Sequence, residues 1–170
     1  MDAMIIQPLV DPFDDVYRRD VYKRQAFGSG EYHLAMEAWI VNSQRQILIQ
    51  HRADSCEVLG GFWGLTTGRM VAGEDTRAGA VREIREELGL SVEANALRHL
   101  LRVARPNHLV WDVYALWMDV ALSGLTLQVE EVEDARWVDE ATFRRMLRSG
   151  AVSYTHLDVY KRQALLYTIF

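Results

Sequence analysis

The chain has 170 residues, of which 49% are hydrophobic and 25% are charged, and its formal net charge is −5 at pH 7. This length fits one domain with one core, and the composition excludes the disordered and membrane-spanning classes. The acidic balance argues against general nucleic-acid binding, and the single cysteine, Cys56, excludes an internal disulfide and a multi-cysteine zinc site. Residues 1–15 are acidic where a signal peptide would be basic, so we expect a cytoplasmic protein that does not bind membranes.

The two ends of the chain contain the same heptapeptide, DVYKRQA, at residues 20–26 and again at residues 158–164. The only two lysines of the chain lie inside these copies. Two perfect copies so far apart are not a structural repeat, and the second copy belongs to a stretch that resembles translated adapter sequence from assembled sequencing data. We interpret residues 20–26 and 153–170 as artefactual, with a duplicated interaction motif as the alternative. The expected organisation is an N-terminal segment at 1–29, one folded domain at 30–152 and an artefactual tail.

The first half of the expected domain has the pattern of a hairpin followed by a loop. Residues 33–41 and 46–50 are apolar runs with β-branched or aromatic members, which predicts strands, and the polar residues 42–45 predict an antiparallel turn. Three glycines around an aromatic pair at residues 53–64 predict a loop that leads into a short strand.

Residues 75–88 have helical periodicity. Asp75 or Thr76 can cap the start of this helix, and Gly89 stands where a left-handed residue commonly ends one. The side expected to face the core is formed by Arg77, Ala80, Val81, Ile84 and Leu88.

The second half of the domain repeats the hairpin pattern before a final helix. Apolar runs at residues 97–104 and 109–120 are separated by a polar turn, and a last strand is predicted at 135–138. Asp139 predicts the cap of a short helix that carries Phe143, Met146 and Leu147. This order of elements predicts an α/β (α+β) sandwich.

Three glutamates, Glu83, Glu86 and Glu87, share one face of the predicted helix because they stand at i, i+3 and i+4. Like charges this close destabilise a helix unless a divalent cation neutralises them, and oxygen-only ligands point to Mg²⁺ or Mn²⁺. Arg82 stands four residues before Glu86 and could orient that carboxylate while leaving the others for the metal. On the glutamates alone, a solvated acidic surface is the alternative.

The residues around the glutamates form a longer motif. Gly68 is followed after five residues by Glu74, then after seven by Arg82-Glu83, and the run ends Ile84-Arg85-Glu86-Glu87-Leu88-Gly89-Leu90. This matches every specified position of the Nudix box, so the chain resembles the Nudix hydrolase family over roughly residues 31–150. The resemblance implies the Nudix fold, in which a mixed sheet lies between helices.

The resemblance also implies a reaction and roles for the box residues. It implies a metal-dependent hydrolase that cleaves the diphosphate linkage of a nucleoside diphosphate derivative or another organic diphosphate. The implied metal ligands are Glu83, Glu86, Glu87 and the carbonyl of Gly68. Glu74 would support the loop and the start of the helix, and Arg82 would hold a glutamate in position.

Residues outside the box supply further candidates. In this family the general base can be a box glutamate or a late acid, and Glu130, Glu131 and Glu133 are the late candidates; an acidic surface turn explains them equally well. His51 and Arg52 end the second predicted strand and could meet a substrate phosphate, although an exposed strand end explains them too. A homodimer is possible.

Two other functions remain open. Residues 30–33 and 39–42 resemble the branch that includes isopentenyl diphosphate isomerase, but the isomerase cysteine is missing after Trp63, and Cys56 lies on the wrong side of that tryptophan. A Nudix-fold module that senses a nucleotide without hydrolysing it is the second alternative, although such modules usually lose box glutamates.

Overall fold

The computed structural model describes residues 33–105 and 109–152. The repeated heptapeptides, the segments at 1–29 and 153–170, and most of the second hairpin turn therefore lie outside the described residues. The described elements are β1 (His33–Val41), β2 (Gln46–Arg52), β3 (Trp63–Gly64), β4 (Thr66–Arg69), α2 (Thr76–Leu88), η1 (Ala94–Ala96), β5 (Arg98–Arg105), β6 (Leu109–Trp117), η2 (Leu122–Gly124), β7 (Val132–Asp139) and α3 (Glu140–Ser149).

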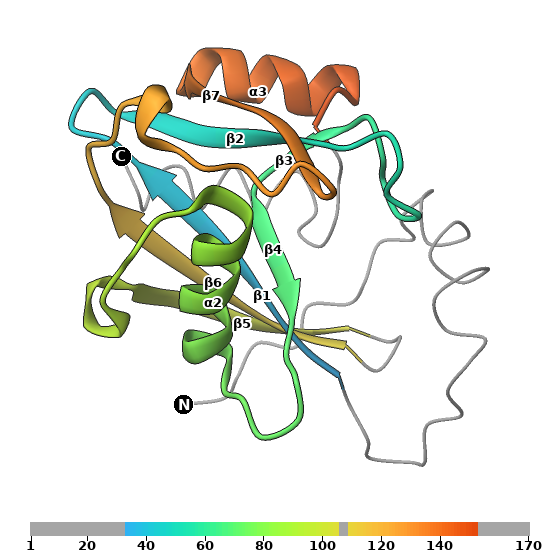
Figure 1. The fold of residues 1–170 in the computed structure, drawn as a ribbon, viewed down its shortest axis with the longest axis vertical. Helices are drawn as coiled ribbons and strands as arrows, with labels where there is room; N and C mark the ends of the chain where they lie inside the picture. Colours follow the sequence, from blue (N-terminus) through green and yellow to red (C-terminus); the bar gives the residue numbers. More distant parts are fainter. Residues whose placement is uncertain (1–32, 106–108, 153–170) are drawn as a thin grey trace, which may run out of the picture.

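The strands form one mixed sheet with helices on both faces, as predicted (Figure 1). Its main order is β3-β2-β1-β6-β5, with β4 also paired to β1 and β7 to β2. β1 and β6 are parallel over their full lengths, whereas the other pairs are antiparallel. Both predicted hairpins, β1 with β2 and β5 with β6, are confirmed.

Alternation along β1 divides the core between the two helices. Trp39 faces α3 and packs edge-on against Phe143, with 5.3 Å between the ring centroids. Met36 and Ala38 face the other way and pack in the cluster that contains Ile84 of α2. The sheet therefore separates two apolar layers, one beneath each helix.

Beneath the second half of α2, strands β2 and β4 lie next to β1 but pair with different parts of it, which leaves an opening between them that we call the fork. β2 pairs with β1 only at Ile47 and Val41 and then diverges, while β4 pairs with the first half of β1, from Ala35 to Ala38. β3 pairs with β2 and leads into β4, so the chain crosses the fork at residues 63–66. This path brings side chains of β2 and β4 together under one helix.

The caps of α2 are those predicted. The carboxylate of Asp75 accepts a hydrogen bond from the backbone N–H of Ala78 at 2.8 Å, and Gly89 is left-handed with φ 71°. Of the expected core side, Ala80, Ile84 and Leu88 are buried. Arg77 and Val81 are only half-buried: the guanidinium of Arg77 extends to the backbone carbonyls of residues 94 and 97, and Val81 packs at the margin of the core cluster.

Several strand boundaries differ from the sequence prediction. β7 begins at Val132 and not at residue 135, because residues 132–139 pair with β2, whose last residue is Arg52 and not Gln50. β6 ends at Trp117 and not at residue 120, where the sheet-pairing with β1 also ends. No helix in the described ranges is long and apolar enough to cross a membrane.

Candidate active site

The first half of the site forms where α2 packs against β4. Glu83 lies against Gly68, and a Cβ atom built at Gly68 would fall 2.1 Å from Oε1 of Glu83. Any side chain at position 68 would therefore displace this carboxylate. The glycine of the motif is needed for a close approach between strand and helix.

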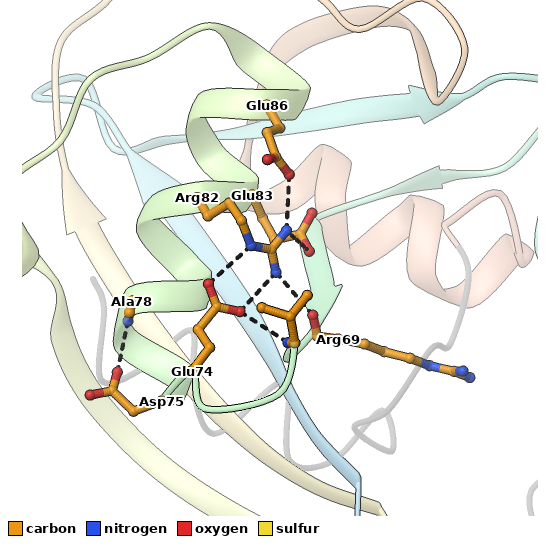
Figure 2. Close-up of polar contacts among 8 residues, drawn as sticks. Arg69, Glu74, Asp75, Ala78, Arg82, Glu83 and Glu86 are labelled. Atoms are coloured by element: carbon orange, nitrogen blue, oxygen red, sulfur yellow. Dashed lines mark hydrogen bonds and ion pairs between the residues drawn. The ribbon is translucent and has the colours of Figure 1, made fainter.

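Arg82 holds three carboxylates together beside that contact (Figure 2). Its Nε and Nη2 donate to the two oxygens of Glu74, both at 3.0 Å, and its Nη1 donates to Glu83 at 2.8 Å and to Glu86 at 2.9 Å. The hydrogen bond to Glu74 is the main reason that the pKa of Arg82 is raised. The expected contact between Arg82 and Glu86 is present, and the same nitrogen also binds Glu83, a carboxylate that was expected to be left for the metal.

Glu74 ties the loop before α2 to the helix. One of its oxygens accepts a hydrogen bond from the backbone N–H of Val71 at 3.2 Å, and the hydrogen bond from Arg82 lowers its pKa. Gly79 permits this packing, since a Cβ atom there would lie 2.2 Å from the sulfur of Met70. The loop and the first turns of α2 thus form one hydrogen-bonded unit.

Glu87 differs from the other two glutamates because it is buried in the fork of the sheet, with 1% of its surface exposed. Its Oε2 accepts a hydrogen bond from Nε2 of Gln50 at 2.7 Å, and the Oε1 of Gln50 accepts one from the hydroxyl of Thr66 at 3.3 Å. Burial raises the pKa of Glu87 to about 8, although the hydrogen bond from Gln50 opposes the shift. The other oxygen, Oε1, is buried and has no hydrogen-bond partner.

These carboxylates are the type of oxygen ligand that a hard divalent cation prefers, but their oxygens do not converge on one position in this structure. No group of three acidic, histidine or cysteine side chains at residues 33–105 and 109–152 has the arrangement of a metal shell. Glu83 and Glu86 share one nitrogen of Arg82, while Glu87 is held by Gln50. The unpartnered oxygen of Glu87 is a donor that a cation would satisfy, and the side chain of Glu86 is about half exposed.

The three late acids have different surroundings. Burial is the main cause of the raised pKa of both Glu83 and Glu87, and the charge of Glu131 adds a smaller contribution, so Glu131 lies within electrostatic range of the two box glutamates. Glu133 instead pairs with Nδ1 of His51 at 2.9 Å. Glu130 is exposed. Of the three late candidates, Glu131 is therefore the one whose charge acts on two glutamates of α2.

His51 and Arg52 point to different neighbours. The His51 ring lies 4.9 Å from that of Trp63, beside its ion pair with Glu133. Arg52 donates from Nε to the carbonyl of Val58 at 3.1 Å, and its charge opposes the rise in the pKa of Glu87, which burial dominates. Arg52 is thus the basic residue of the pair that lies near the buried glutamate.

A second buried acid was not singled out in the sequence. Asp112 of β6 accepts hydrogen bonds from Nε and Nη2 of Arg102 at 2.7 and 2.6 Å, pairs with Nε2 of His99 at 3.0 Å, and bonds to the hydroxyl of Thr76 in the first turn of α2. That hydroxyl also lies 2.9 Å from the hydroxyl of Tyr114. The sequence did contain a signal for this buried acid, because Asp112 is the one charged residue in the apolar run of residues 109–117.

Comparisons with known proteins identify the family and the fold of this chain. The model of the NUDIX domain matches residues 31–157. An uncharacterized Nudix hydrolase of Listeria innocua is 33% identical over 138 residues, which are 80% of each chain. An isopentenyl-diphosphate Δ-isomerase of Escherichia coli is 30% identical over 118 residues, 66% of this chain and 65% of the isomerase. The solved NUDIX domain of Shewanella oneidensis NrtR, complexed with ADP ribose, superposes with a TM-score of 0.61 at 20% identity and covers 89% of this chain and 98% of that one.

Proposed function

The chain belongs to the Nudix hydrolase family, and we propose on this basis that it hydrolyses the diphosphate linkage of a nucleoside diphosphate derivative. The observation that carries the proposal is the pair of glutamates one turn apart on α2. Glu83 lies against Gly68, and Glu87 keeps a buried oxygen without a partner. The ADP ribose complex of a Nudix domain with the same fold supports a nucleotide as the substrate class.

Glu83, Glu86 and Glu87, with the carbonyl of Gly68, would hold one divalent cation, Mg²⁺ or Mn²⁺, because all of these donors are hard oxygens. When bound, such a cation polarises phosphoryl oxygens and makes water a better nucleophile at neutral pH. Arg82 limits how far Glu83 and Glu86 can separate, since one of its nitrogens binds both. A diphosphate substrate is an anion and the chain has a net charge of −5, so a cation at this site would offset the repulsion between them.

Among the three late acids we propose Glu131 as the general base. It is the one whose charge acts on both Glu83 and Glu87, whereas Glu133 is paired with His51. In this role Glu131 takes a proton from the attacking water as the water oxygen bonds to one phosphorus. The bond from that phosphorus to the bridging oxygen breaks, and the second phosphate leaves with this oxygen. Arg52 is the basic residue proposed to meet substrate phosphate.

The test is a panel of nucleotide sugars, dinucleotides, nucleoside triphosphates and other organic diphosphates with Mg²⁺, in which phosphorylated products are identified. We expect two phosphorylated products from at least one nucleotide and a loss on the order of 100-fold in kcat for Glu86→Gln. Glu93→Gln, a change of the same kind at an exposed residue after the helix, should retain the wild-type rate. Equal rates for the two variants would contradict the site assignment.

Isomerisation of isopentenyl diphosphate is the second candidate, because an isomerase is among the relatives at 30% identity. The segment from Trp63 to Arg69 contains no cysteine, and the sulfur of Cys56 lies 3.6 Å from the carbonyl of Glu131. Incubation of the protein with isopentenyl diphosphate separates the two reactions, since a hydrolase releases phosphate and an isomerase only moves the double bond. Binding of nucleotides without any product would instead identify a sensor.

A further inference from the structure

We propose that Gln50 is a positioning residue for the cation site: its amide, oriented by the hydroxyl of Thr66, fixes one oxygen of Glu87 and leaves the other as an open donor. This inference rests on the proposed function, because it assigns Gln50 and Thr66 to the assembly of the same site. Neither residue belongs to the sequence motif. Gln50 lies on β2 and Thr66 on β4, which both precede the loop before α2 in the chain.

The three side chains form one buried chain of hydrogen bonds. Gln50, Thr66 and Glu87 are 2%, 3% and 1% exposed, and the bonds run from Thr66 to Gln50 at 3.3 Å and from Gln50 to Glu87 at 2.7 Å. When Glu87 is ionised, as it must be to hold a cation, the amide can serve both neighbours in only one orientation. With the amide reversed, its oxygen would face the carboxylate of Glu87, where two acceptors repel each other. Thr66, as a donor to the amide oxygen, favours the productive orientation.

Neutrality is the property that suits Gln50 to this position. An arginine or lysine there would also hold Glu87, but it would neutralise the carboxylate and compete with a cation for it. An amide fixes the carboxylate through a single hydrogen bond and adds no positive charge that would compete with a cation. Because the second oxygen of Glu87 has no partner, the arrangement preserves a donor that is both oriented and unsatisfied.

The fork in the sheet is what makes the contact possible. Gln50 follows Leu48 on the side of β2 that faces α2, and Thr66 pairs with Ala38 on the corresponding side of β4. Gln50 also pairs with Gly64, just before the chain enters β4. The residues that orient Glu87 are therefore fixed on strands, which hold a site more rigidly than loops do.

The first arm of the test measures Mn²⁺ binding to the intact chain without substrate, by electron paramagnetic resonance of free Mn²⁺. Gln50→Leu removes the donor and keeps the size of the side chain, and we expect the Kd for Mn²⁺ to rise by about 10- to 100-fold. Thr66→Val, which removes only the hydroxyl, should raise the Kd by a smaller factor, on the order of 5-fold. In assays, added Mn²⁺ should restore part of the lost kcat of both variants, which a general packing defect would not allow.

The control is Thr67→Val, the same chemical change on the next residue of β4, which pairs with Glu37 on the opposite face of the sheet. The Kd of this variant for Mn²⁺ should stay within about 2-fold of the wild-type value. A loss of affinity equal to that of Thr66→Val would overturn the proposal. A wild-type Kd in either folded Gln50→Leu or Thr66→Val would also overturn it, and Thr66→Val decides the matter if the leucine variant does not fold. Failure of the wild-type protein to bind Mn²⁺ would contradict the proposed function and this inference together.

Discussion

Two carboxylates are buried on the sheet side of α2, and they have opposite surroundings. Asp112 lies under the first turn and Glu87 in the last turn, and each is only 1% exposed. Asp112 is surrounded by the side chains of Arg102, His99 and Thr76, all of which bond to it. Glu87 has one donor, Gln50, and one oxygen without a partner. Equal burial is therefore compatible with a structural acid at one end of the helix and a reactive acid at the other.

Because of these different surroundings, the pKa of one acid is raised above its ordinary value and the pKa of the other is lowered. Burial raises the pKa of Asp112, but its hydrogen bonds, from Arg102 above all, outweigh burial and bring the pKa to about 2. Burial of Glu87 meets only the one opposing hydrogen bond and raises its pKa to about 8. Asp112 has the paired hydrogen bonds and the positive charge of Arg102, which Glu87 lacks, and these distinguish an acid that stabilises the fold from one kept for a ligand.

The largest effect should come from removing the charge of Glu87. Glu87→Gln keeps the shape and the contact with Gln50 but removes a cation ligand, so we expect kcat/KM with Mg²⁺ to fall by on the order of 10³-fold, or about 4 kcal/mol of transition-state stabilisation. Steady-state kinetics on the best substrate of the panel measure this. A loss below tenfold would remove Glu87 from the catalytic site.

The same substitution should affect the pH dependence of stability with a defined sign. The pKa of Glu87 is raised in the folded protein above its value of 4.5 in the unfolded chain. The contribution of Glu87 to the free energy of unfolding is therefore fully present below pH 4.5 and is lost as the pH rises through about 8. Without divalent cations, we expect Glu87→Gln to gain about 2–4 kcal/mol over the wild type between pH 5 and pH 9. Urea unfolding at the two pH values provides the measurement, and a difference independent of pH would speak against the raised pKa.

Asp112 should show the reverse pattern of activity and stability. Its pKa is depressed, so its contribution is present above the unfolded value of 3.8 and is lost as pH falls toward about 2. Asp112→Asn leaves the guanidinium of Arg102 without its anion, and because Arg102 is partly exposed we expect a loss of about 2 kcal/mol at pH 7. Urea unfolding should detect it, with a smaller change in Kd for Mn²⁺ than in Glu87→Gln. Unchanged stability would show that Asp112 is not a structural acid.

A smaller effect is expected at the contact between β4 and α2. Gly68→Ala places a Cβ atom where the carboxylate of Glu83 lies, so Glu83 must turn away and kcat should fall by about tenfold. Gly124→Ala is the control, because a Cβ atom there meets nothing closer than 3.7 Å. If both alanine variants keep wild-type kcat, the close approach at Gly68 has no role in the reaction.

The elements of the fold could be predicted from the sequence where local signals decide them. Asp75 or Thr76 and Gly89 predicted the limits of α2 to within one residue, and the apolar run of residues 33–41 predicted both limits of β1. The start of β7 could not be predicted in the same way, because the residues Val132–Asp134 read as an acidic turn and become a strand only by pairing with β2. Parallel pairing of β1 with β6, 76 positions apart, has no local signal either.

The site was predictable to a similar extent. The fixed spacing from Gly68 to Gly89 indicated which glutamates matter, but it placed Glu83, Glu86 and Glu87 on one face as equals. Their difference in burial arises from the fork in the sheet, which puts Gln50 and Thr66 beside Glu87 from 37 and 21 positions away. Side chains that meet through tertiary structure leave no trace in helical periodicity.

The contrast between Glu87 and Asp112 is tested most directly by the effect of Mn²⁺ on the thermal midpoint of three proteins. At a concentration about 100-fold above its Kd, Mn²⁺ should stabilise the wild type by about 2.7 kcal/mol, which raises Tm by several degrees. We predict a similar rise for Asp112→Asn from its own lower Tm, and little or none for Glu87→Gln. An equal rise in Glu87→Gln, or a rise lost only in Asp112→Asn, would contradict the assignment of the open carboxylate oxygen to the cation site.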